Sequence, residues 1–560
     1  MPSRVSRGFA FSVLAAVLIL AGLAPAQNPP PATDLPATVL RVTTRLILVD
    51  VIVSDKDGRP VPGLTRDDFV LLEDGNPQTI AAFSFENPAS RAAGWTPPPH
   101  LPPNVYTNRP QHRTPPGPLT ILLLDSLNTP WRDQAYMRQE MLKYIRTQVR
   151  PDQRVAILAL TNNLIVLQDF TTDSRLLLAA LERFAGERSV ELSRAEPVEI
   201  PASALATAPP DAVERITAGL DRFNAEQVVL STDSRVVTTL AALRVIARAT
   251  AGYPGRKNLV WVSAAFPFTL APERSGNMDM FRSYATEVRR TASVLTDAQV
   301  AVYPVDARGL VGATFVDVSS PSDPFRIVSS HATMNQLAHD TGGKAYYNRN
   351  DIDVAVNSAV ADGASYYSLA YYPEDKKWDG KFRRIEVKLN RAGLQVRYRR
   401  GYYATDTVAP ERAEKSEKKS EKDELQEMKS ILSDPLPATA ITFVARVQLP
   451  APADKELMAE FRVDATTLRF DPAPDGRRFK ADFLVAAVSP DGRIVTSASR
   501  TVEAALNPQQ HAAIQQSGLP FKLPLALVPG RYQRLRLVVR DHLSGLAGAV
   551  DVPLTLTVAD

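Results

Sequence analysis

Residues Thr120-Ile121-Leu122-Leu123-Leu124-Asp125 decide the fold of the central part of this 560-residue chain. Four apolar side chains in a row end on a carboxylate, and the polar loop Ser126-Leu127-Asn128-Thr129 follows at once. A short, continuously apolar run predicts a strand buried on both faces, as in a parallel sheet covered by helices. We therefore expect an α/β domain with Asp125 at the carboxyl end of its first strand.

Strands and helices alternate downstream of this run. Apolar residues recur at helical spacing at Met137, Met141, Tyr144, Ile145 and Val149. Further strands are predicted over 155–160, 164–167, 258–263 and 300–306, and helices over 174–184, 238–251, 283–298 and 334–340. Repeated strand–helix units give a mostly parallel sheet with helices on both faces. The pattern predicts a doubly wound α/β domain over 119–362, with 186–211 as an irregular insertion.

The chain on both sides of this domain is rich in strand patterns. Residues 38–86 predict a small β domain, because the β-branched run 46–53 precedes a turn that ends at Gly58. Residues 363–405 alternate polar and apolar and predict a β extension, packed on the α/β domain or beside the first β unit. Residues 436–560 hold seven short strands, which predict an immunoglobulin-like β-sandwich.

Two stretches have the composition of linkers. Residues 87–118 contain ten prolines and little apolar periodicity, which predicts an extended linker. Residues 406–435 begin with a run dominated by interleaved Glu, Lys and Ser, which predicts a solvated, charged linker.

The first 26 residues have the layout of a secretory signal peptide. Arg4 and Arg7 precede an apolar run over 9–23, and Ala24-Pro25-Ala26 matches a cleavage site. The run is shorter than the roughly 20 residues that a membrane span needs. We therefore expect an exported protein, periplasmic or extracellular, with no membrane span in its mature chain. The sequence has no cysteine, so its domains must be held by core burial rather than by disulfides.

Charge and motif content argue against nucleic-acid binding and against catalysis. The formal net charge is only +4, and acids are interleaved with bases, whereas nucleic-acid binding needs a concentrated basic face. None of the six histidines lies in an H-E-x-x-H pair, no G-x-S-x-G motif occurs, and no thiol is present. We expect no enzyme activity, and we assign no catalytic or cofactor-binding residue.

The loop after the first strand has the oxygen ligands of a cation site. Asp125 supplies charge, and the hydroxyls of Ser126 and Thr129 supply neutral oxygens at the sheet edge where ligands bind. Mg²⁺ or Mn²⁺ would suit such ligands. A second interpretation stays open, because Thr129 precedes Pro130 and is suited to cap a helix.

Four segments together carry a resemblance to a known family over roughly residues 38–405. The chain resembles the von Willebrand factor type A (VWA) domain and, more closely, the secreted VWFA-related proteins that are abundant in Acidobacteria. The segments are Leu122-Leu-Leu-Asp-Ser-Leu-Asn-Thr129, Pro254-Gly255-Arg256-Lys257, Val305-Asp306-Ala307-Arg308-Gly309 and Arg399-Arg400-Gly401-Tyr402-Tyr403.

The resemblance implies a metal-ion-dependent adhesion site, with a D-x-S-x-S loop, a threonine from a second loop and an aspartate after a later strand. Asp125 matches the first aspartate and Thr129 can replace the second serine. Leu127 stands where the first serine should be and cannot ligate.

The remaining two ligand positions are less well matched. Thr239 or Thr232 is the candidate threonine, and the late aspartate position falls near Ala264. Asp306 ends a strand at the same edge and is a further candidate ligand.

These observations lead to one main functional hypothesis. We expect an exported, non-enzymatic binding or adhesion protein that contacts a protein partner through a VWA-like domain with a degenerate adhesion site. The alternative is a structural scaffold of an envelope or secretion complex with no metal role, in which the tyrosine-rich strand or the C-terminal sandwich makes the contacts. A metal-dependent hydrolase that uses Asp125 and Asp306 is a third, weaker hypothesis.

Overall fold

The computed structural model describes residues 46–87, 97–112, 118–266, 284–309, 324–375, 377–404, 427–448, 456–474, 476–528 and 530–558. The predicted signal peptide 1–26, the start of the predicted β domain, and residues 406–426 of the predicted charged linker lie outside them. In the part of the chain that is described, no helix is long and apolar enough to cross a membrane.

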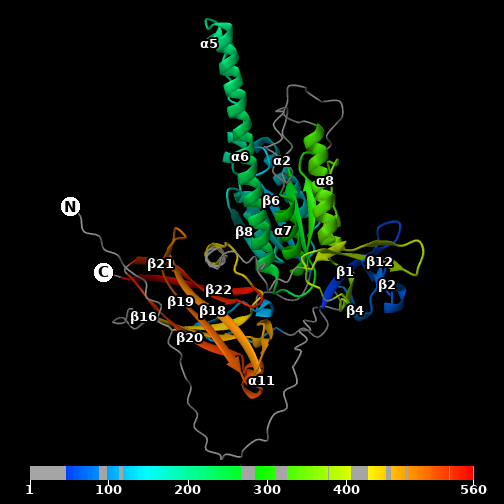
Figure 1. Ribbon diagram of the computed structural model, residues 1–560, viewed down its shortest axis with the longest axis vertical. Coiled ribbons are helices and arrows are strands. Elements are labelled where there is room, and N and C mark those ends of the chain that lie inside the picture. Colours follow the sequence, from blue (N-terminus) through cyan, green and yellow to red (C-terminus); the bar gives the residue numbers. More distant parts are fainter. Residues whose placement is uncertain are drawn as a thin grey trace, which may run out of the picture. The chain divides into compact units, whose positions relative to one another are not determined.

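A five-stranded sheet forms the centre of the α/β domain (Figure 1). Its strand order is β10-β9-β6-β7-β8, and every neighbouring pair is parallel except β7 and β8. Strands β6, β7, β9 and β10 are buried at every residue, as the apolar run around Leu122 predicts. The strands are β6 (Leu119–Asp125), β7 (Arg154–Leu160), β8 (Leu164–Thr171), β9 (Lys257–Ser263) and β10 (Val300–Asp306).

Helices cover both faces of this sheet. One hydrophobic core packs α6, α7 and α8 against one face, and a second packs α2, α3 and α9 against the other. Asp173 caps α3 as expected, because its side chain accepts the backbone N–H of Arg175. The helices are α2 (Trp131–Thr147), α3 (Ser174–Arg183), α4 (Val190–Arg194), α5 (Ala202–Leu205), α6 (Pro210–Thr250), α7 (Ala285–Asp297), α8 (Pro324–Thr341) and α9 (Ile352–Asp362).

The helices differ from the prediction in more than one region. The range 186–211, predicted to be irregular, contains α4 and α5, and α6 begins 28 residues before the predicted start at Thr238. In its first half, α6 has apolar residues that face solvent rather than the core, so the usual core-facing periodicity is missing there. Helix α8 also begins ten residues before the predicted Met334.

The N-terminal strands and the strands of 363–405 form one β unit with a shared core. Its two sheets have the orders β13-β1-β11-β4 and β14-β12-β2-β3. The strands of 363–405 therefore lie beside the first β unit, which is one of the two predicted arrangements. Strand β11 pairs with β1, and β12 pairs with β2. The elements are β1 (Ile47–Ser54), η1 (Arg66–Asp68), β2 (Phe69–Glu73), β3 (Asn76–Pro77), β4 (Ile80–Glu86), β11 (Tyr366–Tyr371), β12 (Phe382–Leu389), β13 (Gln395–Arg397) and β14 (Gly401–Tyr403).

The range 87–118 is not only a linker. It contains β5 (Val105–Thr107) and the short helix η2 (Pro110–His112), and β5 pairs antiparallel with β15 more than 300 residues later. Asn108 then enters the C-terminal domain, where its side chain donates to the carbonyl of Ile441 and accepts the N–H of Phe443. Proline content predicted an extended chain, and it could not reveal the distant strand with which β5 pairs.

The C-terminal region consists of two antiparallel sheets around one hydrophobic core. One sheet has the order β20-β16-β15-β5, and the other β17-β18-β21-β22 with β19 beside β18. All seven predicted strands are present, and a short helix stands between two of them. The elements are β15 (Phe443–Gln448), β16 (Glu456–Val463), η4 (Ala465–Thr467), β17 (Asp471–Ala473), β18 (Gly476–Val488), β19 (Ile494–Leu506), α11 (Pro508–Ser517), β20 (Leu519–Ala526), β21 (Gly530–Asp541) and β22 (Ala547–Val558).

Candidate functional site

The carboxylate of Asp125 lies fully buried at the carboxyl end of β6. Three N–H groups donate to it at 2.9 Å: the backbone N–H and Nδ2 of Asn128, and Nε1 of Trp261. The Ser263 hydroxyl lies 2.9 Å from Oδ2 and 2.8 Å from the carbonyl of Ala265, between which it divides its one proton. A carboxylate accepts about four hydrogen bonds, so this chain itself fills the acceptor positions of Asp125.

Burial governs the electrostatics of this carboxylate. Desolvation raises the pKa of Asp125 above its usual range, and the hydrogen bonds from Asn128, Ser263 and Trp261 lower it only in part. No cationic side chain is among the causes of this pKa shift. Asp125 is thus held by neutral donors.

Thr129 connects the carboxyl ends of the neighbouring strands β6 and β9. Its Oγ1 accepts the backbone N–H of Ala264, 3.0 Å away, at the end of the neighbouring strand β9. The capping interpretation is wrong, because α2 starts at Trp131 with Pro130 at its N-cap and no side-chain cap. The Thr129 hydroxyl instead links the loop after β6 to the end of β9, at the point where the strand order reverses.

Asn128 joins the loop to helix α6. Its Nδ2 donates to Thr239 Oγ1 at 3.0 Å, and its Oδ1 accepts Nη1 of Arg235 at 3.4 Å. Arg235 is buried and also donates to Thr232 Oγ1. Both candidate threonines are therefore near this loop, but Thr239 reaches Asp125 only through Asn128, and Thr232 binds the guanidinium.

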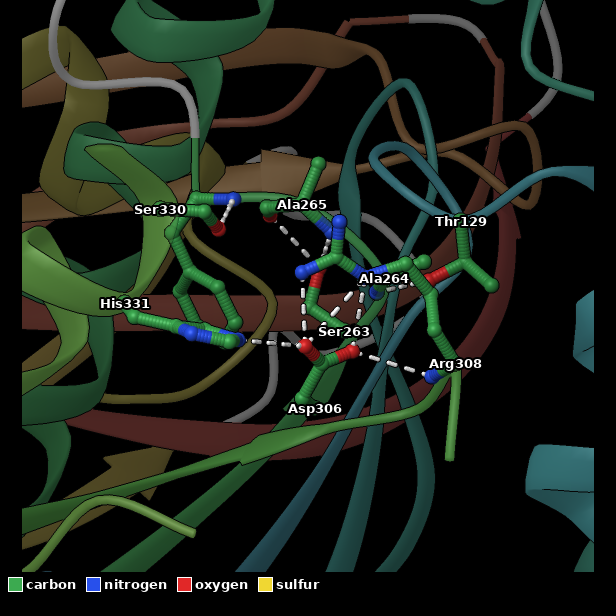
Figure 2. A network of polar contacts seen from close by, with 9 residues as sticks. Thr129, Ser263, Ala264, Ala265, Asp306, Arg308, Ser330 and His331 are labelled. Atoms are coloured by element: carbon green, nitrogen blue, oxygen red, sulfur yellow. Dashed lines mark hydrogen bonds and ion pairs between the residues drawn. The ribbon is translucent and has the colours of Figure 1, made fainter. Parts of the chain in front are cut away.

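Asp306 lies at the same edge, at the end of β10 (Figure 2). Its carboxylate accepts two hydrogen bonds from the Arg308 guanidinium, the closer at 2.6 Å, and lies 3.2 Å from Nε2 of His331. Burial raises the pKa of Asp306, but the hydrogen bonds from His331 and Arg308 outweigh it, and the pKa lies below its usual range. Asp306 is therefore an ion-paired anchor for Arg308.

The residues at this edge do not fit a divalent cation. The Asp125 oxygens already accept hydrogen bonds from this chain, and Thr129 Oγ1 accepts a backbone N–H. The guanidinium of Arg235 is hydrogen-bonded to Asn128, which is part of the loop. Ser126 Oγ is the loop oxygen left without a partner among the described residues, and one hydroxyl is no ligand set. In the same part of the chain, no group of three His, Cys, Asp or Glu side chains is placed to hold a metal. Cation binding by Asp125 and Thr129 stays a prediction, and these contacts argue against it.

Solvent reaches other side chains near this edge. Trp131, two residues after Thr129, is 53% exposed. A Cβ at Gly186 would lie 2.5 Å from Gln134 Oε1 and 3.3 Å from the Trp131 ring, so a glycine is required for this close approach. The indole is thus an exposed aromatic side chain with a fixed neighbour.

A pocket of about 170 Å³ opens beside the same loop. Leu127 contributes apolar surface to it. The α4 residues Glu191 and Arg194, which form an ion pair at 3.1 Å, contribute charge. The lining consists of Leu127, Asn162, Val190, Glu191, Arg194, Ser234 and Thr238.

Two of the quoted segments lie at the opposite edge of the sheet. Arg256, just before β9, donates Nη2 to Tyr303 Oη and to the carbonyl of Gly342. Arg399 donates to the carbonyl of Leu48 at 2.6 Å inside the N-terminal β unit. Tyr366 Oη on β11 of the same unit accepts the backbone N–H of Arg256 at 2.9 Å, which ties the unit to this edge. These segments have a structural role, away from Asp125.

Sequence reasoning missed Asn128, Trp261 and Arg235. A signal for Trp261 exists, because an indole N–H inside a buried strand needs an acceptor. Arg235 gave a weaker signal, since its helix was predicted to begin later. Neither pattern names the partner, which lies over 100 residues away in the sequence for both.

Comparison with known proteins gives similarity to solved structures only. No protein family profile matches the sequence, and no curated protein matches it. Similar structures are an aerotolerance-related membrane protein of Bacteroides fragilis (13% identity, 44% of this chain, 98% of that chain, TM-score 0.24) and BatB of Bacteroides thetaiotaomicron (12%, 44%, 99%, 0.24). Another is proximal thread matrix protein 1 of the mussel byssus with a zinc-occupied MIDAS motif (8%, 46%, 48%, 0.23). TM-scores this low assign no function to this chain.

The topology described above defines the class of the central domain. A parallel sheet with β6 at its centre, an antiparallel edge strand β8 and three helices on each face make it a VWA-like α/β domain.

Proposed function

We propose that this chain is an exported, non-enzymatic binding protein whose VWA-like domain contacts a protein partner without a bridging metal ion. Hydrogen bonds from Asn128 and Trp261 to Asp125 take the place that a cation holds in a metal-dependent site. The signal-peptide layout of residues 1–26 supports export.

The exposed indole of Trp131 is the observation that supports this proposal most. Tryptophan is enriched among the residues that dominate protein–protein interfaces, because it buries a large area at a low cost in conformational entropy. A half-exposed Trp131 on a helix N-terminus is therefore a contact point for a partner. The pocket beside Leu127 is proposed to receive a partner side chain, and the Glu191–Arg194 ion pair supplies charge at its lining.

Site-specific photocrosslinking tests the proposal. The full chain would carry benzoylphenylalanine at position 131, and matched chains would carry it at Leu176 and Ile494, which are also exposed. We expect one protein from an envelope extract to cross-link at position 131 and not at 176, with equal yield in EDTA and in Mg²⁺.

Two outcomes would contradict the proposal. Loss of the cross-link in EDTA would mean that a metal ion bridges the partner. A cross-link at position 494 in the C-terminal domain, with none at 131, would favour the scaffold alternative.

A further inference from the structure

The N-terminal half of α6 does not belong to the hydrophobic core of the domain. The helix has 41 residues, which is about 60 Å at the rise of an α-helix. Its buried residues all lie from Ser231 onward, and none lies in 210–230. Figure 1 shows this half, on the α5 side, extending beyond α2.

Large apolar side chains on α6 face solvent at a spacing of seven residues. Ile216, Phe223, Leu230 and Val237 are 41%, 46%, 63% and 57% exposed. Val213 and Leu220 lie three residues before Ile216 and Phe223, and both are partly buried. The spacing of three and four in turn is the a and d pattern of a coiled coil.

We name this face the α6 seam. It consists of the a residues Val213, Leu220, Gln227 and Ser234 and the d residues Ile216, Phe223, Leu230 and Val237. None of its a or d positions carries a charge. One flank is occupied by this chain, because Asn224 exchanges two hydrogen bonds with the backbone of Val198. The d residues nevertheless remain exposed.

We propose that the α6 seam pairs with the same seam of a second copy of this chain, parallel and in register. A strict heptad spacing calls for a helical partner with the same periodicity, and a second copy supplies one. In this register Gln227, one of two polar a positions beside Ser234, meets Gln227 of the other copy. An amide carries both donor and acceptor, so the pair is self-complementary, and a buried polar a position fixes register.

The area of the seam is sufficient for a dimer. The four d side chains expose on the order of 400 Å² in each copy, which is at the scale of the largest apolar patches on monomers. With the a positions and flanking residues, pairing would bury on the order of 1,200 Å² in total, above the roughly 1,000 Å² expected of a specific interface.

Gly219 is a second observation that points to a helix on this face. A glycine inside a helix costs about 1 kcal/mol relative to alanine. Apart from its own helix, none of the described residues lies within 4 Å of where its Cβ would be, so packing among them does not explain the glycine. Gly219 precedes Leu220 on the edge of the seam, where bare backbone lets a second helix approach closely.

Sedimentation of the full mature chain tests this proposal. We expect a dimer at micromolar concentration, and we expect Phe223→Asp to raise the dimer dissociation constant by about 100-fold or more. Because Phe223 is exposed, the variant should keep the circular dichroism and thermal unfolding of the monomer. Ala218→Asp, at an exposed position on the opposite face of the helix, is the matched control and should leave the dissociation constant unchanged.

Cysteine cross-linking tests the register, since the chain has no cysteine of its own. Leu230→Cys should form an interchain disulfide under mild oxidation, because parallel in-register pairing brings residue 230 beside its own copy. Ala218→Cys should not. If the chain stays monomeric at micromolar concentration, the proposal is wrong, and another protein would then be the partner of the seam. A dimer that Phe223→Asp does not weaken, or that Leu230→Cys does not cross-link, would also overturn it.

Discussion

The carboxylate of Asp125 takes its hydrogen bonds from two parts of the chain: Asn128 in the loop after β6, and Trp261 and Ser263 on β9. Each donor is itself buried, so none can turn to water if the carboxylate is removed. An unsatisfied buried donor costs about 1–3 kcal/mol. Asp125 therefore stabilises the edge of the sheet on which the candidate site lies.

Replacing Asp125 should lower stability without changing a response to metal. We expect Asp125→Ala to reduce the free energy of unfolding by about 2–4 kcal/mol, because two or more buried donors lose their acceptor. Asp67→Ala, at an exposed carboxylate, should change it little. Chemical denaturation with and without millimolar Mg²⁺ or Mn²⁺ is the measurement. A metal-dependent rise in stability that Asp125→Ala abolishes would show a working adhesion site.

Lys257 gives stability a pH dependence. Its ammonium is buried at the start of β9 and donates to the carbonyl of Tyr253. Burial lowers the pKa of Lys257 to about 7, and the charge of Asp50 opposes this only in part. The folded protein releases this proton near pH 7, whereas the unfolded chain keeps it until about pH 10.5. Stability contributed by Lys257 therefore rises with pH across this window.

Urea denaturation between pH 7 and pH 10 should show this effect. We expect the free energy of unfolding to gain up to about 1.4 kcal/mol per pH unit from this one group. Lys257→Met, which cannot be protonated, should show a smaller slope. Equal slopes in the two proteins would mean that Lys257 does not titrate in this range.

At the scale of elements, one side chain joins the two sheets of the N-terminal β unit. Glu73 on β2 is buried, and its Oε2 accepts the hydroxyls of Tyr371 at 2.5 Å and Tyr402 at 3.0 Å. Tyr371 belongs to the sheet of β1, and Tyr402 to the sheet of β2. Burial and then the hydrogen bond to Glu73 raise the pKa of Tyr371 above its usual range.

The two tyrosines should not contribute independently. We expect Tyr371→Phe to cost about 1–2 kcal/mol in unfolding free energy, since a buried hydrogen bond is lost, and Glu73→Leu to cost more, because two buried hydroxyls lose their acceptor. A double-mutant cycle should give a coupling of about 0.5–3 kcal/mol. Additive effects would show that the hydrogen bond between Glu73 and Tyr371 contributes nothing to stability.

At the scale of the whole molecule, segments far apart in the sequence complete each other. Strand β11 lies between β1 and β4, so residues 46–87 supply both of its neighbours. The C-terminal region is likewise joined to α6, because Thr439 Oγ1 accepts the N–H of Gly252 and donates to the carbonyl of Ala249. The α/β domain is thus connected at the residue level to both flanking β regions.

Removing residues 1–96 tests this dependence. The shortened chain keeps β5 and the central sheet, but it exposes the backbone of β11 and its buried Tyr367 and Leu369. We expect amides of 366–371 to exchange with deuterium much faster than in the full chain, while those of 119–125 stay protected. Unchanged protection of 366–371 would mean that β11 does not need its neighbours.

Local patterns in the sequence were sufficient for much of the fold. The buried run that ends at Asp125, the cap at Asp173 and the strands of the C-terminal region follow from side-chain periodicity and from turn residues, which act over a few residues. The main feature that the sequence patterns did not predict was the N-terminal half of the long helix α6. Its exposed seam has a period of 3.5, but it faces away from the core that the prediction assumed.

Only the tertiary structure decided which residues distant in the sequence contact each other. The sequence by itself determined that Asp125 would end a buried strand at the ligand-binding edge of a sheet. It did not determine that Trp261, 136 residues later, donates to that carboxylate, or that β5 pairs with β15. Hydrogen-bond partners depend on which buried groups the folded chain brings within about 3 Å of each other. Periodicity specifies the face on which a residue lies, whereas its partner on that face depends on how the whole chain packs.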